Sequence, residues 1–188
     1  RLTMKEAFSV HKEIIEWKAQ FSETKIPEQA LGVDWLTARL MQWMFKSWNR
    51  IEFANKYLAG TFMPRIQLDF IPSLKSSAHF AISANKKPTT VAEYIVAGRA
   101  IQTFWLTTAK LGLGFQPEQT PVIFAKYLNN DLKFTEDNDV IKNAKKGKDM
   151  FEKLVNNSEN TVFMGRVGRS ELPKARSTRL PLEKLIIQ

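Results

Sequence analysis

A long stretch with few charged side chains constrains the fold more than any other feature of the sequence. Between Val91 and Gly112, apolar residues recur at steps of three and four, which is the period of an α-helix. The opposite side of this helix is also apolar, and the only charged residues in it are Glu93, Arg99 and Lys110. A helix that is apolar nearly all round is typically buried. We therefore expect the rest of the chain to pack around this segment.

Both ends of this helix carry recognisable signals. Thr89 or Thr90 is expected to cap its first turn, and the run Leu-Gly-Leu-Gly at 111–114 is a typical helix stop. Gly98, in the middle, costs about 1 kcal/mol relative to Ala, so we expect another helix or a flat ligand to approach closely there. Residues 115–120 then leave the helix as a loop.

Composition narrows the class of protein without deciding its function. The chain has no cysteine, which excludes disulfides and thiolate chemistry and is compatible with a reducing compartment. No apolar run approaches the ~20 residues of a membrane span, and we expect no signal peptide. We therefore expect a cytoplasmic protein with no membrane partner. The net charge of +9 is compatible with nucleic acid, with an anionic small molecule or cofactor, or simply with solubility.

Periodicity and breakers predict the remaining elements. Asp34 is a good cap for a long helix from Trp35 to about residue 59, whose aromatic residues predict either plain core packing or an aromatic wall over a cofactor. His79, Ala81 and Ser83 should share one face of a strand, with Phe80 and Ile82 on the other. The predicted elements are an amphipathic helix 2–21, an irregular segment 61–75, a strand 77–84, a short helix or turn 121–128, an amphipathic helix 138–155, a strand 160–168 and an extended tail 169–188.

Several kinds of chemistry lack support in the sequence. There is no glycine-rich phosphate loop and no Gly-x-Ser-x-Gly motif, and two distant histidines without cysteine argue against a metal site. No side chain is singled out as a catalytic acid, base or nucleophile. The tail carries Lys174, Arg176 and Arg179 close together, and these cations predict either a phosphate site or a flexible basic end.

Two segments resemble a known family. The run Ala-Gly-Arg-Ala-Ile-Gln-Thr-Phe-Trp-Leu-Thr-Thr-Ala-Lys-Leu-Gly-Leu-Gly-Phe-Gln-Pro at 97–117 is similar to a diagnostic stretch of the nitroreductase-like FMN flavoproteins. The segments 162–168 and 173–186 are similar to the C-terminal end of that family. More narrowly, the segment at 97–117 resembles the long variants found in dormancy-associated nitroreductase-like proteins, or fused to an adenylating, ThiF-like domain. The match covers about residue 76 to the end.

The resemblance implies an α+β fold, with a mixed sheet flanked by helices around a long buried helix. It implies a single nitroreductase-like domain over residues 1–188, and the start at Arg1 together with the lack of the family's upstream arginine motif suggests the C-terminal part of a longer chain. Gln116, Pro117, Glu118 and Gln119 would lie near the isoalloxazine of FMN, with their backbone amides facing its N5 edge. Lys174, Arg176 and Arg179 would supply the cations that bind the flavin phosphate.

The function that the resemblance implies is hydride transfer from NAD(P)H, through flavin N5, to an electron-poor small-molecule acceptor. A homodimer or a companion polypeptide would complete the flavin site. The alternative is a non-catalytic nitroreductase-like module that binds flavin or acts as a scaffold in a larger adenylating protein. A nucleic-acid-binding domain is supported only by charge, because no stacking-plus-arginine motif accompanies the basic residues.

Overall fold

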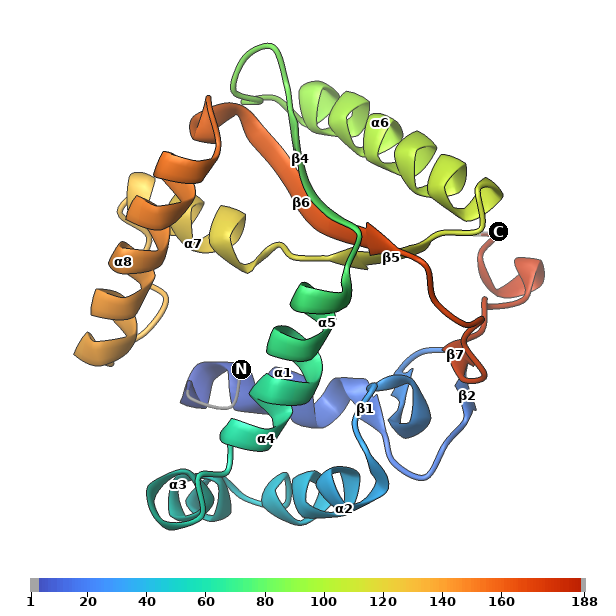
Figure 1. The fold of residues 1–188 in the computed structure, drawn as a ribbon, viewed down its shortest axis with the longest axis vertical. Helices are drawn as coiled ribbons and strands as arrows, with labels where there is room; N and C mark the ends of the chain where they lie inside the picture. Colours follow the sequence, from blue (N-terminus) through green and yellow to red (C-terminus); the bar gives the residue numbers. More distant parts are fainter. Residues whose placement is uncertain (1–3, 187–188) are drawn as a thin grey trace. The chain divides into compact units, whose positions relative to one another are not determined.

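The computed structural model describes residues 4–186, which form two compact units (Figure 1). Unit 1 contains residues 4–74 and 172–186, and unit 2 contains residues 75–171. The fold of the protein is of the mixed α+β class expected from the sequence. Among the described residues, no helix is both long enough and apolar enough to cross a lipid bilayer.

Unit 1 is built mostly from short helices. Its elements are α1 (Lys5–Ile14), β1 (Ile15–Glu16), β2 (Phe21–Ser22), β3 (Ile26–Pro27), η1 (Glu28–Ala30), α2 (Trp35–Met44), α3 (Trp48–Tyr57), α4 (Phe62–Arg65), η2 (Ile66–Phe70), α5 (Ile71–Lys75), β7 (Arg176–Ser177) and η4 (Leu182–Lys184). Its strands form two parallel pairs, β1 with β3 and β2 with β7, each two residues long.

The prediction of a single long helix from Trp35 to about residue 59 is wrong. The helix is interrupted after Met44, where α2 ends, and α3 begins at Trp48. The break allows Phe45 and Ile51 to face the same core, together with Met41 and Ala54. Phe45 also packs against Phe8 and Trp17 from the N-terminal segment, with ring centroids 6.1 and 5.7 Å away. Part of the aromatic content therefore serves plain core packing, whereas Trp35 and Tyr57 remain exposed.

The Asp34 cap is confirmed, and one residue from a distant part of the same unit, Gln67, supports it. The Asp34 carboxylate accepts hydrogen bonds from the amides of Leu36 and Thr37, the Thr37 hydroxyl and the Gln67 side chain. These bonds favour the charged form, so the Thr37 hydroxyl and the Gln67 amide lower the pKa of Asp34 from 3.8 to about 2.

The prediction that residues 61–75 are irregular is also wrong, because α4, η2 and α5 form one continuous helical run. Pro64 lies in the first turn, where its missing N–H costs no intrahelical bond. Before Pro72 the helix widens to a π turn, in which the amide of Ile71 reaches the carbonyl of Ile66. Two prolines therefore occur in this run without ending it.

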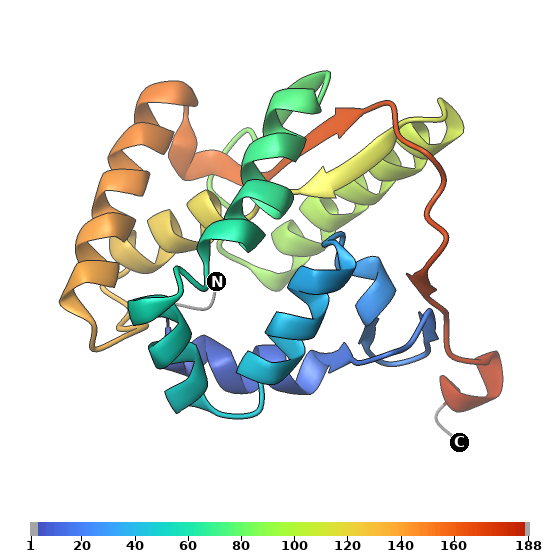
Figure 2. The same cartoon turned by 60° about the horizontal axis from the view of Figure 1, so that its bottom comes forward.

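Unit 2 contains the three-stranded sheet of the protein. Its elements are β4 (Ala78–Ser83), α6 (Val91–Lys110), β5 (Gly114–Pro117), α7 (Thr120–Asn129), α8 (Asn138–Leu154), η3 (Ser158–Asn160) and β6 (Thr161–Gly168). The strand order is β4-β6-β5, and both pairings are antiparallel. Helix α6 runs along one side of this sheet, and α7 packs against α8 (Figures 1 and 2). The strands expected at 77–84 and 160–168 and the helices at 121–128 and 138–155 are confirmed.

An aromatic cluster joins α6 to the sheet. Phe104 lies 4.6 Å from Phe80 on β4, and Trp105 stacks at 4.3 Å on Phe115 of β5, measured between ring centroids. Phe163 on β6 completes the cluster against Phe80 and Phe115. Phe80 therefore lies on the face that packs against α6, as the alternation of the strand predicts, and His79 falls on the opposite face.

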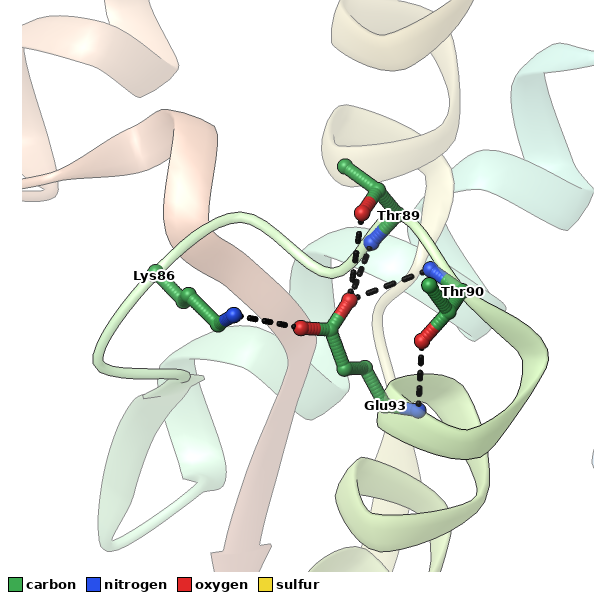
Figure 3. Close-up of polar contacts among 4 residues, drawn as sticks. All are labelled: Lys86, Thr89, Thr90 and Glu93. Carbon is green, nitrogen blue, oxygen red and sulfur yellow. Dashed lines mark hydrogen bonds and ion pairs between the residues drawn. The ribbon is translucent and has the colours of Figure 1, made fainter.

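The start of α6 is held by a dense polar network (Figure 3). Thr90 and Glu93 form a reciprocal capping box, and the Glu93 carboxylate also accepts from the amide of Thr89 at 2.9 Å. Lys86 Nζ lies 2.7 Å from the same carboxylate. The Lys86 ammonium, followed by the amides of Thr89 and Thr90, holds the pKa of Glu93 well below its usual range. The cap expected at Thr89 or Thr90 is thus Thr90.

The expectation that α6 is buried nearly all round is wrong. Thr108 is its only buried residue, and Val91 and Val96 are 77% and 65% exposed. The three-stranded sheet covers one side of the helix, which leaves the opposite apolar side without a cover in unit 2. A side chain added at Gly98 would meet no described atom within 4 Å, so the close approach expected there is not present either.

Candidate functional site

The four residues expected beside a flavin ring occupy the end of β5 and the link to α7. Gln116 and Pro117 belong to β5 and stand opposite Arg166 and Gly165 of β6. Glu118 and Gln119 follow directly and precede the first residue of α7. The segment predicted as a loop is therefore half strand, because β6 supplies hydrogen-bonding partners that no local signal in the sequence indicates.

Residues 118 and 119 are fastened to β6 beyond the end of the strand pairing. The amide of Glu118 donates to the carbonyl of Met164 at 2.9 Å. The Gln119 side chain accepts from the amide of Met164 at 3.4 Å and donates to the carbonyl of Val162 at 3.5 Å. Pro117 has no N–H, and the amide of Glu118 is committed to the sheet. Gln116 pairs with Arg166 two residues before this bond in the same antiparallel register, so its amide also points to β6. Of the four amides expected to face a ligand, only that of Gln119 remains a candidate.

A histidine, a carboxylate and an arginine meet on the face of the sheet opposite the aromatic cluster. His79 of β4 and Gln116 of β5 both stand opposite Arg166 of β6, so the three residues form one row across the sheet. Glu118 completes the cluster, because its two carboxylate oxygens lie 2.8 Å from His79 Nδ1 and 2.9 Å from an Arg166 guanidinium nitrogen. Sequence reasoning did not identify His79 or Arg166 as site residues.

Burial differs strongly within this cluster. The side chain of Arg166 is 10% exposed, that of Glu118 21% and that of His79 46%. Arg166 is thus a nearly buried cation, and Glu118 is the carboxylate that compensates its charge. When His79 is neutral and donates Nδ1–H to Glu118, its other ring nitrogen, Nε2, is the basic one. The ion pair orients a half-exposed imidazole on the polar face of the sheet.

Gly165 brings the strands of this site together. A Cβ at this position would lie 2.8 Å from the Phe80 ring and 2.9 Å from the carbonyl oxygen of Gln116, distances that side chains do not tolerate. Only glycine therefore fits between the aromatic face and β5. The polar row at His79 and Arg166 lies next to this tight packing.

The three cations of the tail belong to unit 1 and are exposed. Arg176 begins β7, whose backbone pairs with β2, and its amide donates to the carbonyl of Gln20 at 3.2 Å. Gln20 donates in turn to the carbonyl of Lys174 at 2.9 Å. Ala175 is the buried residue of this segment, whereas Leu172 is 89% exposed, so the tail docks through its backbone and Ala175 rather than through its leucines.

The side chains of Lys174, Arg176 and Arg179 fit an anionic ligand chemically. Within residues 4–186, none of the three forms an ion pair with a carboxylate. The guanidinium groups of Arg176 and Arg179, which have no carboxylate partner, are suited to bidentate contacts with phosphate. The donors expected for a flavin phosphate and those expected for the flavin ring thus belong to different compact units.

The described residues contain no cluster of side chains that could hold a metal ion. No three side chains among His, Asp and Glu gather there as a metal ion would require. The His79–Glu118 pair alone offers two candidate ligands, and the Arg166 cation beside it opposes a metal ion.

Comparison with known proteins leaves the family open. The chain matches no protein-family model, no curated protein and no solved structure. The nitroreductase-like assignment therefore rests on the residues of this chain.

Proposed function

We propose that this chain is an FMN-dependent NAD(P)H oxidoreductase of nitroreductase type. The observation that best supports the proposal is the course of residues 91–119, the part that carries the resemblance. The capped helix α6 leads through Gly112, whose φ is +68°, into β5, and the following backbone is fastened to β6. A backbone segment held in this way can present the amide of Gln119 to a flat ligand at little cost in conformational entropy.

The residues of the chain have distinct parts in this proposal. FMN, when bound, would supply the hydride chemistry between NAD(P)H and an electron-poor acceptor. Lys174, Arg176 and Arg179 would hold its phosphate. His79, oriented by Glu118 on the polar face of the sheet, would exchange a proton with the acceptor. This last part adds a residue to the site that the resemblance does not indicate.

A second polypeptide, either another copy of the chain or a companion, is part of the proposal. The exposed side of α6 supports it, because Val91, Ile95 and Leu106 share one side of the helix and are each more than half exposed. A row of this kind is atypical of a monomeric surface. A partner that covers this side could also complete the flavin site.

The alternative is a non-catalytic module that binds flavin or acts as a scaffold. One observation favours it: the amides of Gln116 and Glu118, two of the four expected to face the flavin N5 edge, are used within the sheet. In this case FMN would bind without reacting with a nicotinamide.

Adding FMN to the purified chain tests both functions. We expect binding to quench flavin fluorescence, and NAD(P)H to bleach the flavin absorbance when oxygen is excluded. The double variant Arg176→Met/Arg179→Met should weaken FMN binding by roughly tenfold or more, since charge-assisted hydrogen bonds to phosphate are lost. Lys145→Met, on an exposed part of α8, is the matched control and should change nothing.

Each outcome separates the candidates. Binding with bleaching and turnover of a nitroaromatic compound or a quinone supports the oxidoreductase. Binding with no reaction supports the module. Failure of the folded chain to bind FMN, alone or with the partner it purifies with, would refute both.

A further inference from the structure

A hollow in unit 2 is lined, except for Gln119, by residues that the proposed flavin chemistry does not use. It measures about 230 Å³ and lies among α6, α7, the loop that precedes α6 and the beginning of β6. Val122, Ile123 and Val162 give it an apolar wall, and Lys87, Tyr94 and Lys126 supply polar groups. Ligand sites generally combine an apolar lining with a few polar groups that converge.

The polar groups of this pocket are arranged around one lysine. Lys126 Nζ donates a hydrogen bond to the Tyr94 hydroxyl oxygen at 2.7 Å. Nζ lies 4.5 Å from the centre of the Tyr94 ring, so it sits beside the hydroxyl rather than over the aromatic face. The carbonyl of Lys126 accepts from the Asn130 side chain at 2.7 Å, which steadies the end of α7.

This arrangement leaves donors for a ligand. An ammonium group has three N–H bonds, and Tyr94 takes one of those of Lys126. The Tyr94 hydroxyl keeps its own hydrogen, because it acts as the acceptor in that bond. In the described residues, neither Lys87 nor Lys126 forms an ion pair with a carboxylate. One carboxylate, that of Glu159, also lies on the lining, so cations outnumber anions there.

We propose that this pocket binds a small organic anion in which a carboxylate or phosphate is attached to a flat apolar body. The anionic group would accept from Lys126 and from the Tyr94 hydroxyl, with Lys87 as a second cation. The body would lie on Val122, Ile123 and Val162. The volume is below the roughly 300–1,000 Å³ typical of drug-sized ligands, so the body corresponds to a single ring.

The inference goes beyond the proposed flavin function and does not depend on it. Gln119 touches both regions, because it lines the pocket and also follows β5. The binding test uses protein without flavin and probes without colour. Its failure therefore leaves the flavin proposal standing, and the reverse also holds.

Calorimetry with four probes tests the proposal. Phenyl phosphate and benzoate carry both the charge and the ring, whereas benzyl alcohol lacks the charge and inorganic phosphate lacks the ring. We expect the two organic anions to bind at least tenfold more tightly than the other two probes. Equal binding of benzyl alcohol, or no binding of either organic anion at millimolar concentration, would overturn the proposal.

Variants locate the binding. Lys126→Met should lower the affinity for phenyl phosphate roughly tenfold or more, and Tyr94→Phe should lower it severalfold while keeping the ring. Lys142→Met, on the exposed side of α8 and outside the pocket, is the matched control. Amide spectra of each variant report whether it folds. An equal loss in Lys126→Met and Lys142→Met would mean that the anion is attracted only by the general positive charge, and the assignment of the pocket would be wrong.

Discussion

Replacing Glu118 by glutamine tests whether the His79–Glu118–Arg166 cluster holds the sheet together. The substitution keeps the size of the side chain but removes the charge that compensates Arg166. Breaking a fully buried ion pair by removing one partner costs about 3–5 kcal/mol. Arg166 is nearly buried, but the Glu118 side chain is 21% exposed and a glutamine oxygen can still accept one hydrogen bond. We therefore expect unit 2 to lose about 2 kcal/mol of stability.

Hydrogen exchange is the suitable assay, because it reports on one unit at a time. A loss of about 2 kcal/mol should raise the exchange of the slowest β6 amides roughly thirtyfold, when exchange follows the opening equilibrium. The matched control is Glu152→Gln, which breaks a pair with Lys148 one helical turn away on α8. The Lys148 and Glu152 side chains are 24% and 34% exposed, so neither is as buried as Arg166. An i,i+4 helix pair contributes about 0.3–0.5 kcal/mol, so we expect about a twofold change.

A double-mutant cycle isolates the pair from the other contacts of Arg166. Arg166→Met removes the cation, and the double variant removes both charges. Because the unpaired charge causes the penalty, the double variant should be less destabilised than the sum of the two single variants. If Glu118→Gln has no more effect than Glu152→Gln, or if the two single effects are additive, the cluster is not a coupled, nearly buried pair and the reasoning fails.

Three further predictions concern unit 1. Asp34 has a pKa lowered from 3.8 to about 2, so its contribution to stability is complete above the unfolded pKa and disappears as pH falls through about 2. Asp34→Asn should therefore flatten the stability of unit 1 between pH 4 and 2, as acid titration by circular dichroism would show. Ala59 has a positive φ of 48°, so Ala59→Gly should stabilise the unit by about 0.5–1 kcal/mol in urea denaturation. Gly60→Ala should destabilise it, because a Cβ there would lie 2.8 Å from that of Ala54.

Structural features that depend on residues two or three positions apart could be predicted from the sequence. The caps at Asp34 and Thr90 are of this kind, because each side chain bonds amides two or three positions away. Strand alternation also placed His79 and Phe80 on opposite faces. Such features need no knowledge of the rest of the fold.

The end of α3 shows where local reasoning stops. The sequence indicates that Gly60 ends a helix, but Ala59 takes the left-handed conformation and Gly60 follows it. The amides of both Leu58 and Gly60 donate to the carbonyl of Ala54, which leaves no room for a side chain at position 60. The glycine is thus needed for close packing, and the position one residue earlier carries the backbone strain.

The polar cluster depends on strand register, which the sequence does not show. His79 and Glu118 are 39 residues apart, and Arg166 and Glu118 are 48 apart. A shift of one residue in either strand pairing would turn His79 or Gln116 to the aromatic face. The sequence could identify the residue types, but only the pairing of β4 and β5 with β6 brings them together.

Helix α6 has an apolar surface that favours burial, but the described residues supply a packing surface for only part of it. Its apolar composition indicates that most of its surface is better packed against protein than exposed to water. Burial also requires a facing surface, and the three strands of unit 2 supply one on a single side only. The prediction of a buried helix and the proposal of a second polypeptide therefore rest on the same requirement, that the exposed apolar side of α6 packs against a protein surface. If the chain is a stable monomer in solution with the row from Val91 to Leu106 still open to exchange, both lose their physical basis.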